Sequence, residues 1–216
     1  ICPEIIEFKA RHMNDAKANG FVDGKTKNYR YDAVKFCHKV FALTHCALSN
    51  PSEKLYWIDA DTIFFKPITD DFLDQILPKG YYTSYLGRRD KHSETGFMGF
   101  DLQHNSNIEF MEFWRNIYDQ DMLFDLPEWH DCFVYDELRK YFEAKCVVKS
   151  FDIRKNYEDD HHPFINSPLG GFMDHLISEH RKEVGCSFAS DLRTTRKELY
   201  WQLVPYMPEE FAVKQV

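Results

Sequence analysis

The sequence predicts an α/β fold, and three observations lead to that class. Short apolar segments with the character of strands alternate with longer segments whose apolar residues recur at helical spacing. The clearest short segment, Leu55–Ile58, is too short for a helix and has polar neighbours, which is typical of a buried strand in a parallel sheet. That segment runs directly into two carboxylates, Asp59 and Asp61, and ligands of open α/β sheets bind at such strand ends.

Composition places the chain among globular proteins. Hydrophobic residues make up 44% of its 216 residues and aromatic residues 16%, so we expect a single domain, 1–216, with a sizeable core. A formal charge of −8 argues against a general nucleic-acid binder, which usually carries a basic surplus. No apolar run approaches the length of a membrane span, and no signal peptide is visible.

The six cysteines are scattered along the chain, and none forms a C-x-x-C pair, which argues against a zinc knuckle. Scattered cysteines with apolar neighbours usually act as small buried hydrophobic residues. We therefore expect reduced thiols and a cytoplasmic location.

The first third of the chain is predicted to hold a short strand, a loop and a helix. Glu4–Phe8 fits a strand, and polar residues with two glycines follow over 9–30. Asp32 is a suitable N-cap for the next segment. In that segment apolar residues recur at helical spacing: Ala33, Phe36, Cys37, Val40, Leu43 and Ala47.

Beyond the aspartates, turn and capping residues mark the remaining elements. Pro67 interrupts the chain, and Thr69 is expected to cap a short helix with Asp70 and Asp71 in its first turn. We predict strands over 81–86, 96–102 and 145–151, helices over 105–118, 176–184 and 195–203, another helix after 129–131, and a mobile binding loop over 152–171.

Asp59 and Asp61 are suited to holding a divalent cation that bridges phosphate oxygens. A buried strand that ends in two carboxylates gains little stability from them, because desolvated like charges repel. The alternative is that one aspartate caps the next turn while the other is solvated. The strand-end position favours the cation site.

Several stretches occur in the order found in glycosyltransferases of the GT-A fold, and together they resemble that family. The string WIDADTIFFKPI, residues 57–68, looks like the family's metal-binding D-x-D. Arg30-Tyr31-Asp32 with Lys39 resembles the helix before that motif. Glu94–Asp101 resembles the strand near the acceptor site, and His175 with Arg181-Lys182 resembles a late metal-binding histidine with basic neighbours.

The resemblance implies a Rossmann-like, mixed but mainly parallel sheet flanked by helices, and a donor that is a UDP- or GDP-sugar. Its Mn²⁺ or Mg²⁺ would be held by Asp59, Asp61 and His175, with Asp59 also a candidate ribose ligand. Imidazole favours Mn²⁺ over Mg²⁺; the alternative for His175 is a histidine at a helix start with no metal. The diphosphate would pair with four basic residues, of which some are expected to be solvated only: Arg30, Lys39, Arg181 and Lys182.

The chain departs from the family pattern at its start. Such transferases open with a β-α-β unit that holds the base and ribose, and residues 1–30 supply no clear copy of it. We expect a GT-A fold that lacks this unit, through either N-terminal truncation or a reduced fold. The choice of nucleotide stays open.

Two carboxylates are candidates for binding or deprotonating the acceptor. The acceptor would be a carbohydrate or another hydroxyl compound. Asp131 is expected at the start of a helix, and Glu94 opens the glycine-containing strand. The alternatives are a plain N-cap for Asp131 and a solvated loop position for Glu94. Transfer with inversion needs a carboxylate base, whereas retention does not. The late histidine resembles retaining members, which favours retention with Asp131 orienting the acceptor.

Two rival interpretations remain. Asp59-Ala60-Asp61-Thr62 also resembles the first motif of haloacid-dehalogenase-like phosphotransferases, with Asp59 as nucleophile and Asp61 as general acid/base. There Lys149 and 158–160 would supply the later motifs. That motif usually opens its domain, whereas here a long helix precedes it. The other rival is an inactive nucleotide-sugar-binding module with the same fold.

Overall fold

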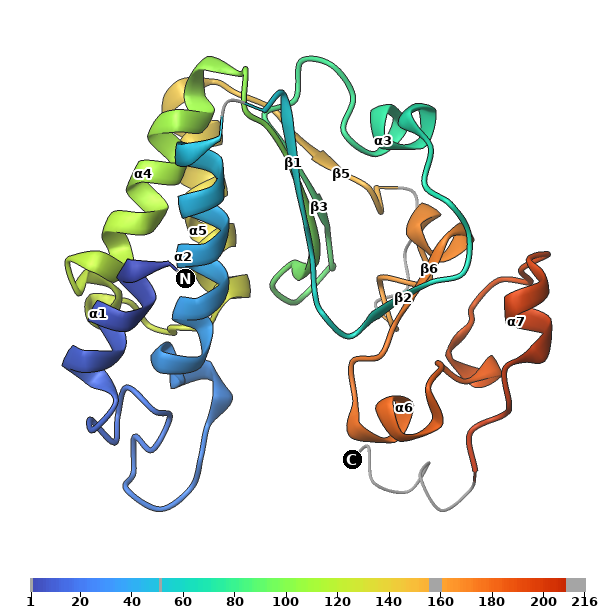
Figure 1. The fold of residues 1–216 in the computed structure, drawn as a ribbon, viewed down its shortest axis with the longest axis horizontal. Coiled ribbons are helices and arrows are strands. Elements are labelled where there is room, and N and C mark those ends of the chain that lie inside the picture. The colour runs from blue at the N-terminus through green and yellow to red at the C-terminus, as the bar shows by residue number, and fades with distance from the viewer. Residues whose placement is uncertain (1, 51, 156–160, 209–216) are drawn as a thin grey trace. The chain divides into compact units, whose positions relative to one another are not determined.

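A computed structural model describes residues 2–50, 52–155 and 161–208, and Figure 1 shows its elements. This part of the chain contains seven α-helices and six strands. The helices are α1 (Pro3–His12), α2 (Ala33–Ser49), α3 (Asp70–Ile76), α4 (Asn105–Asp119), α5 (Asp131–Cys146), α6 (Glu179–Val184) and α7 (Leu199–Leu203). The strands are β1 (Lys54–Ile58), β2 (Thr62–Phe64), β3 (Thr83–Leu86), β4 (Glu94–Asp101), β5 (Ser150–Asp152) and β6 (Met173–His175).

The strands form a four-stranded sheet of order β1-β4-β3-β5 and a separate β2–β6 pair. The larger sheet is mixed and mostly antiparallel. Backbone hydrogen bonds from Leu102 to Glu53 and from Asp59 to Gly96 make β1 antiparallel to β4. The mixed α/β class is therefore confirmed, and the mainly parallel sheet is wrong.

Connection lengths explain the antiparallel pairing. A parallel pair needs a crossover of about a dozen residues or more. Residues 87–93 between the neighbouring strands β3 and β4 are too few for that crossover. β1 is likewise a half-buried edge strand with β4 as its neighbour, rather than the buried parallel strand that we expected from its apolar run.

The chain folds into two compact units. The first, Ile1–Leu55 with Gly80–Thr83 and Phe100–Ser150, contains α1, α2, α4 and α5, which pack against one another as Figure 1 shows. Aromatic rings fill their contacts; Phe8 of α1 lies 5.8 Å from Phe41 of α2 and 6.0 Å from Tyr118 of α4, centroid to centroid. The single domain that we expected for the whole chain stays a prediction.

The second unit consists of Tyr56–Lys79, Ser84–Gly99 and Phe151–Val216. Its core is built by side chains from all three segments, among them Phe72, Phe97 and Phe164. Most of residues 161–171 are buried in this unit. The mobile binding loop predicted over 152–171 is therefore wrong for that part, and residues 156–160 lie outside the described residues.

The capping predictions are confirmed. The Asp32 carboxylate accepts from the backbone N–H of Lys35 at the start of α2, and the Thr69 hydroxyl accepts from that of Phe72 at the start of α3. The strand predicted over Glu4–Phe8 is wrong, because that segment belongs to α1. Pro3 in the first turn and basic residues in the last turn of α1 favour the helix.

Two features bear on the expected environment. No helix in the described part of the chain is long and apolar enough to cross a membrane. All six cysteines are free thiols in the structure, and Cys37 is buried within α2. Burial raises the pKa of the Cys37 thiol to about 12, so it behaves as a small apolar side chain.

Candidate functional site

The β2–β6 pair brings the predicted metal ligands together in the second unit. Thr62 of β2 is paired with His175 of β6, and Asp61 immediately precedes Thr62. The ladder continues one step further, since the backbone N–H of Leu176 donates to the carbonyl of Asp61 over 2.8 Å. An antiparallel ladder therefore fixes two residues that are far apart in sequence at adjacent positions.

The resulting cluster is tight. His175 Nε2 lies 3.1 Å from Oδ1 of Asp61 and 3.9 Å from Oδ2 of Asp59. Each of the three residues offers a ligand atom within 4.8 Å of the other two. His175 is buried, with 3% of its surface exposed, whereas both aspartates are partly exposed. The carboxylates are therefore open to solvent while the imidazole is fixed by its surroundings.

The charge on Asp61 is well stabilised. The hydrogen bond with His175 holds the pKa of Asp61 well below its usual range, and Lys182 lowers it further, although partial burial acts in the opposite direction. Lys182 Nζ lies 3.3 Å from Oδ2 of Asp61. Partial burial alone would lower the pKa of Lys182, but the contact with Asp61 raises it. Both groups stay charged at neutral pH.

Asp59 is oriented by β1 itself. The indole N–H of Trp57 donates to Oδ1 of Asp59 over 2.6 Å, and the backbone N–H of Asp59 donates to the carbonyl of Gly96 in β4 over 2.9 Å. Trp57 was not among the predicted site residues. Its i, i+2 spacing from Asp59 puts both side chains on one side of an extended segment, so the sequence did contain that signal.

Gly96 makes room for the buried histidine. A Cβ at this position would lie 2.5 Å from Cε1 of His175 and 3.1 Å from Oε1 of Glu94. Glu94 also accepts from the backbone N–H of Gly96 over 2.9 Å and lies 3.9 Å from Arg88. The predicted residue Glu94 therefore lies beside the same glycine as the imidazole of the cluster, and close approach by side chains explains a glycine in this strand.

The donor set fits a divalent cation. Two carboxylates and one imidazole suit Mn²⁺, and an ionised Asp61 needs no proton removed before it binds a metal. The ring of His175 packs against the ring of Phe164 in a tilted arrangement, with centroids 4.9 Å apart, and its Nε2 contacts Asp61. Among the described residues, the buried Nδ1 of His175 has no hydrogen-bond partner, so Nε2 is the atom available to a ligand on the cluster side.

No family model matches this chain, and no curated protein matches it either. The resemblance to glycosyltransferases of the GT-A fold therefore stays a prediction from the residues themselves.

Arg181, predicted to bind the diphosphate, is occupied by a buried carboxylate. Its guanidinium donates to both oxygens of Asp191, over 2.9 and 2.6 Å, and to Ser178 over 2.9 Å. Burial alone would raise the pKa of Asp191, but hydrogen bonds from His161 and Arg181 hold it well below its usual range. This pairing favours a structural role for Arg181 over phosphate binding.

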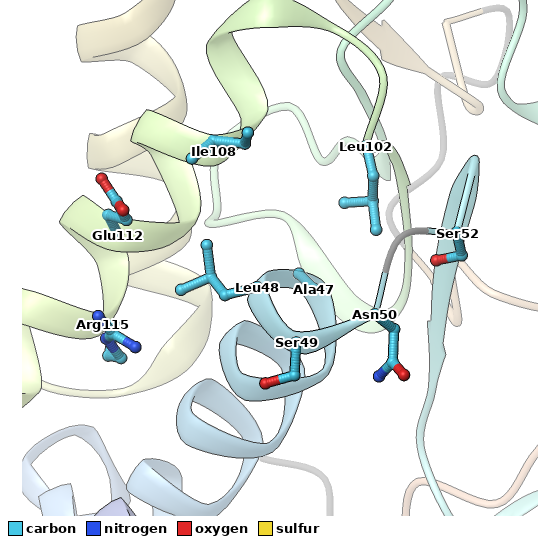
Figure 2. Close-up of a pocket in the computed structure, with 9 residues that line it drawn as sticks. All are labelled: Ala47, Leu48, Ser49, Asn50, Ser52, Leu102, Ile108, Glu112 and Arg115. Carbon is cyan, nitrogen blue, oxygen red and sulfur yellow. The ribbon is translucent and has the colours of Figure 1, made fainter.

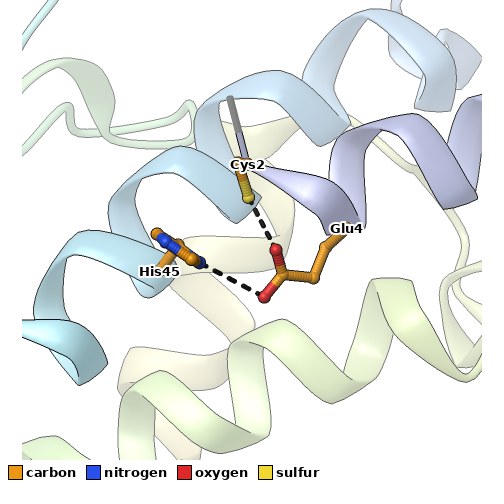
Figure 3. A group of neighbouring side chains, drawn as sticks. All are labelled: Cys2, Glu4 and His45. Carbon is orange, nitrogen blue, oxygen red and sulfur yellow. Dashed lines mark hydrogen bonds and ion pairs between the residues drawn. The ribbon is translucent and has the colours of Figure 1, made fainter.

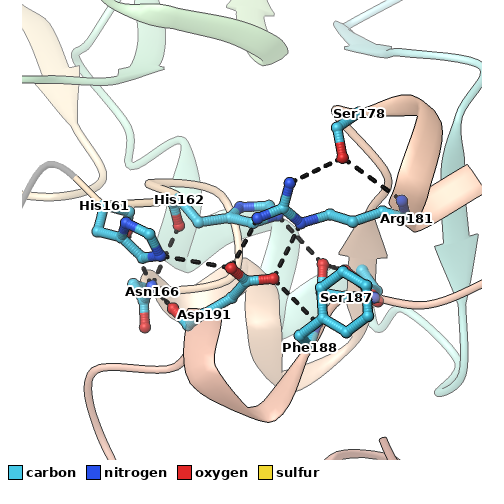
Figure 4. Close-up of polar contacts among 9 residues, drawn as sticks. His161, His162, Asn166, Ser178, Arg181, Ser187, Phe188 and Asp191 are labelled. Carbon is cyan, nitrogen blue, oxygen red and sulfur yellow. Dashed lines mark hydrogen bonds and ion pairs between the residues drawn. The ribbon is translucent and has the colours of Figure 1, made fainter. Parts of the chain in front are cut away.

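Figure 4 shows this pair within a larger polar network of the second unit. His162 Nε2 lies 3.1 Å from the Ser187 hydroxyl, which donates to Asp174. Burial lowers the pKa of His162 to about 3, so the imidazole is neutral. The network ties the segments before and after β6 together, and β6 carries His175.

Three other predicted residues lie in the first unit. Lys39 of α2 forms an ion pair with Asp131, with Nζ 2.6 Å from Oδ2 and both side chains largely buried. Asp131 begins α5 as predicted, but the N-cap is His130. Arg30 pairs with Glu128 over 2.9 Å and is half exposed. Structural roles account for Lys39 and Asp131, and their roles toward a nucleotide or an acceptor stay predictions.

A separate surface pocket of about 480 Å³ lies in the first unit (Figure 2). It is lined by Ala47, Leu48, Ser49, Asn50, Ser52, Leu102, Ile108, Glu112 and Arg115. None of the predicted site residues lines it. Residues 158–160, invoked for the phosphotransferase interpretation, lie outside the described residues.

Proposed function

We propose that this protein is a metal-dependent glycosyltransferase that moves a sugar from a nucleoside-diphosphate donor to a hydroxyl acceptor. The observation that carries the proposal is the convergence of Asp59, Asp61 and His175. Asp61 and His175 are separated by 114 positions in the sequence, yet their side chains are in hydrogen-bond contact. The three residue types at these places are those that the resemblance assigns to the metal.

The environment of the cluster supports this proposal. A nucleoside diphosphate is a poor leaving group until its developing negative charge is neutralised, and a bound Mn²⁺ would supply that neutralisation as a Lewis acid. Lys182 is a second cation beside Asp61 and is 43% exposed, so its ammonium can turn from that carboxylate to a diphosphate oxygen. Trp57 keeps Asp59 in a fixed orientation for the metal or a ribose hydroxyl.

Glu94 is the carboxylate of this unit best placed to contact an acceptor. It lies beside Gly96, as the imidazole of His175 does, and Arg88 holds its other oxygen at 3.9 Å. We assign Glu94 the role of orienting an acceptor hydroxyl by accepting its hydrogen bond. This role does not require Glu94 to remove the proton, and it is compatible with transfer that retains the anomeric configuration.

The test is a panel of UDP- and GDP-sugars with MnCl₂, read by thermal shift and by slow release of the nucleoside diphosphate. We expect one donor class to raise the melting temperature only when Mn²⁺ is present, and to be hydrolysed slowly without acceptor. Asp61→Asn should lose both responses. Asp71→Asn, an exposed aspartate in the first turn of α3, is the matched control and should retain them.

Other outcomes separate the rival functions. Hydrolysis of phosphate esters with Mg²⁺, together with trapping of a phosphate mimic on Asp59, would identify a phosphotransferase instead. A Mn²⁺-dependent thermal shift without any turnover, with acceptors included, would identify a binding module. Equal responses in Asp61→Asn and the parent would refute the metal assignment.

A further inference from the structure

A group of three side chains of the types that ligate metals lies in the first unit, away from the residues used above. Figure 3 shows Cys2 and Glu4 at the start of α1 facing His45 of α2. The Cys2 thiol donates to Oε2 of Glu4 over 2.9 Å, and His45 Nδ1 lies 3.4 Å from Oε1 of Glu4. All three ligand atoms lie within 4.8 Å of one another, and all three residues are partly buried.

We propose that Cys2, Glu4 and His45 bind a Zn²⁺ ion that links α1 to α2. The donor set of one thiolate, one carboxylate and one imidazole suits zinc, which takes sulfur, nitrogen and oxygen ligands in tetrahedral sites. With ordinary zinc–ligand bond lengths, neighbouring donors of a tetrahedral site lie roughly 3.4–3.6 Å apart. The separation between His45 Nδ1 and Oε1 of Glu4 already matches that range, at 3.4 Å, whereas the Cys2 thiol contacts the other carboxylate oxygen, Oε2.

The local fold holds these donors together before any metal binds. Cys2 is the N-cap of α1 and Glu4 lies in its first turn, so both residues are at the N-terminal end of this helix. The Cys2 sulfur also lies 3.6 Å from the carbonyl of Phe41, one helical turn before His45 in α2. Phe8 packs on Phe41 two turns along α1 from Cys2, which fixes the approach of the two helices.

Binding requires one proton to leave. The thiol proton that now lies between Cys2 and Glu4 is released to solvent, and a neutral His45 carries its ring proton on Nε2. The sulfur, the carboxylate and Nδ1 of His45 then bind the cation through their lone pairs. Because Cys2 now contacts Oε2 of Glu4 while His45 faces Oε1, the carboxylate turns on binding so that one oxygen reaches tetrahedral separation from both the sulfur and the imidazole. With three protein ligands, the fourth position is left to a water molecule.

This site is independent of the proposed transferase function, and a thiolate ligand distinguishes the two experimentally. Co²⁺ binds zinc sites and gives a sulfur-to-cobalt charge-transfer band only when a thiolate coordinates it. The Asp59, Asp61 and His175 cluster contains no sulfur, so it cannot produce that band. The titration uses the full chain after removal of metals with a chelator, in the Asp61→Ala background so that the other cluster does not compete.

We expect one Co²⁺ per chain with the thiolate band, and Zn²⁺ should displace it. Cys2→Ser should abolish the band, and His45→Asn should weaken Co²⁺ affinity at least tenfold. The matched control is Cys46→Ser, which removes the thiol next to His45 in sequence and should leave the band unchanged. Circular dichroism of the metal-free variants checks that each one folds as the parent does.

A Zn²⁺ titration followed by melting temperature gives a second readout. In the Asp61→Ala background, zinc at a hundredfold its dissociation constant should raise the melting temperature by about 5–10 °C, and it should not do so when Cys2→Ser is added. Absence of a thiolate band, a band that survives Cys2→Ser, or a band lost equally in Cys46→Ser would each overturn the proposal. Glu4→Gln, which keeps the size of the side chain, provides a further variant if Cys2→Ser does not fold.

Discussion

Replacing Gly96 by alanine should displace the buried histidine of the metal cluster while leaving the fold intact. The added Cβ would lie 2.5 Å from Cε1 and 2.9 Å from Nδ1 of His175, whereas ordinary contact begins at 3.4 Å. The imidazole must therefore retreat by roughly 0.9 Å, the difference between these distances, or the strands must separate. Phe164 packs against the ring and resists that retreat.

Displacement of this size has a measurable cost. Disturbing the groups that orient a metal ligand typically lowers metal affinity by about 10–100-fold, or about 1.4–2.7 kcal/mol. Overpacking should also lower the free energy of unfolding by about 1–3 kcal/mol. We expect Gly96→Ala to weaken Mn²⁺ binding in that range, measured by isothermal titration calorimetry, with an unchanged circular dichroism spectrum.

Gly99→Ala is the matched control. A Cβ at Gly99 would lie 2.6 Å from the Ser84 hydroxyl and 3.0 Å from Tyr56, so this substitution crowds the same strand without touching the cluster. It should cost similar stability and leave Mn²⁺ affinity unchanged. If both variants bind Mn²⁺ as the parent does, or lose affinity equally, Gly96 does not position His175.

Three further predictions concern the ion pairs. Asp191→Asn should lower the free energy of unfolding by about 3–5 kcal/mol, because it leaves the buried Arg181 guanidinium uncompensated. Since the pKa of Asp191 is depressed in the folded state, the stability that this carboxylate contributes is fully present above about pH 4 and is lost as the pH falls through its folded-state pKa. Thermal melts below about pH 4 should therefore show the parent losing more stability than the variant does. Lys182→Met should weaken nucleoside-diphosphate binding in the presence of Mn²⁺ about tenfold, with Lys197→Met as control, and equal affinities in calorimetry would remove Lys182 from the site. Asp131→Asn should destabilise the protein by breaking the ion pair with Lys39, yet kcat should stay within about tenfold of the parent and proton NMR should show a retained anomeric configuration. An inverted linkage, with kcat lowered by about 10²–10⁴-fold, would instead make Asp131 the catalytic base.

Local chemistry made much of the fold predictable from the sequence. Asp32 and Thr69 mark helix starts because their side chains satisfy backbone N–H groups of the first turn, and the structure has both contacts. Helices α2 and α4 follow from long amphipathic patterns. These signals depend on neighbouring residues alone, so they need no knowledge of the tertiary structure.

The sheet was harder to predict, because strand pairing is decided by distant residues. The apolar run of β1 fits a buried parallel strand equally well, but β1 is an antiparallel edge strand beside β4. α1 was mistaken for a strand because Ile5, Ile6 and Phe8 outweighed Pro3 and the charges at its ends. Tertiary pairing decided the case of β1, whereas for α1 the local signals at the helix ends were the decisive ones.

The candidate site was likewise predictable where the signal is local and not where it depends on distant residues. Asp59 and Asp61 are two positions apart in the sequence and could be singled out directly, and His175 came from the resemblance to a known family. The contacts of Trp57, Gly96 and Phe164 with this cluster depend on the β1–β4 and β2–β6 pairings. The buried pairing of Arg181 with Asp191 could not be read from sequence, since nothing in the pattern joins residues 181 and 191.

The most direct test of the central claim is anomalous diffraction at the manganese edge from crystals grown with MnCl₂ and a nucleoside diphosphate. We expect one strong peak within coordination distance of His175 Nε2 and of a carboxylate oxygen from Asp59 and Asp61, with diphosphate oxygens on its open side. A peak elsewhere on the chain, or nucleotide bound with no metal at these three residues, would contradict the metal assignment.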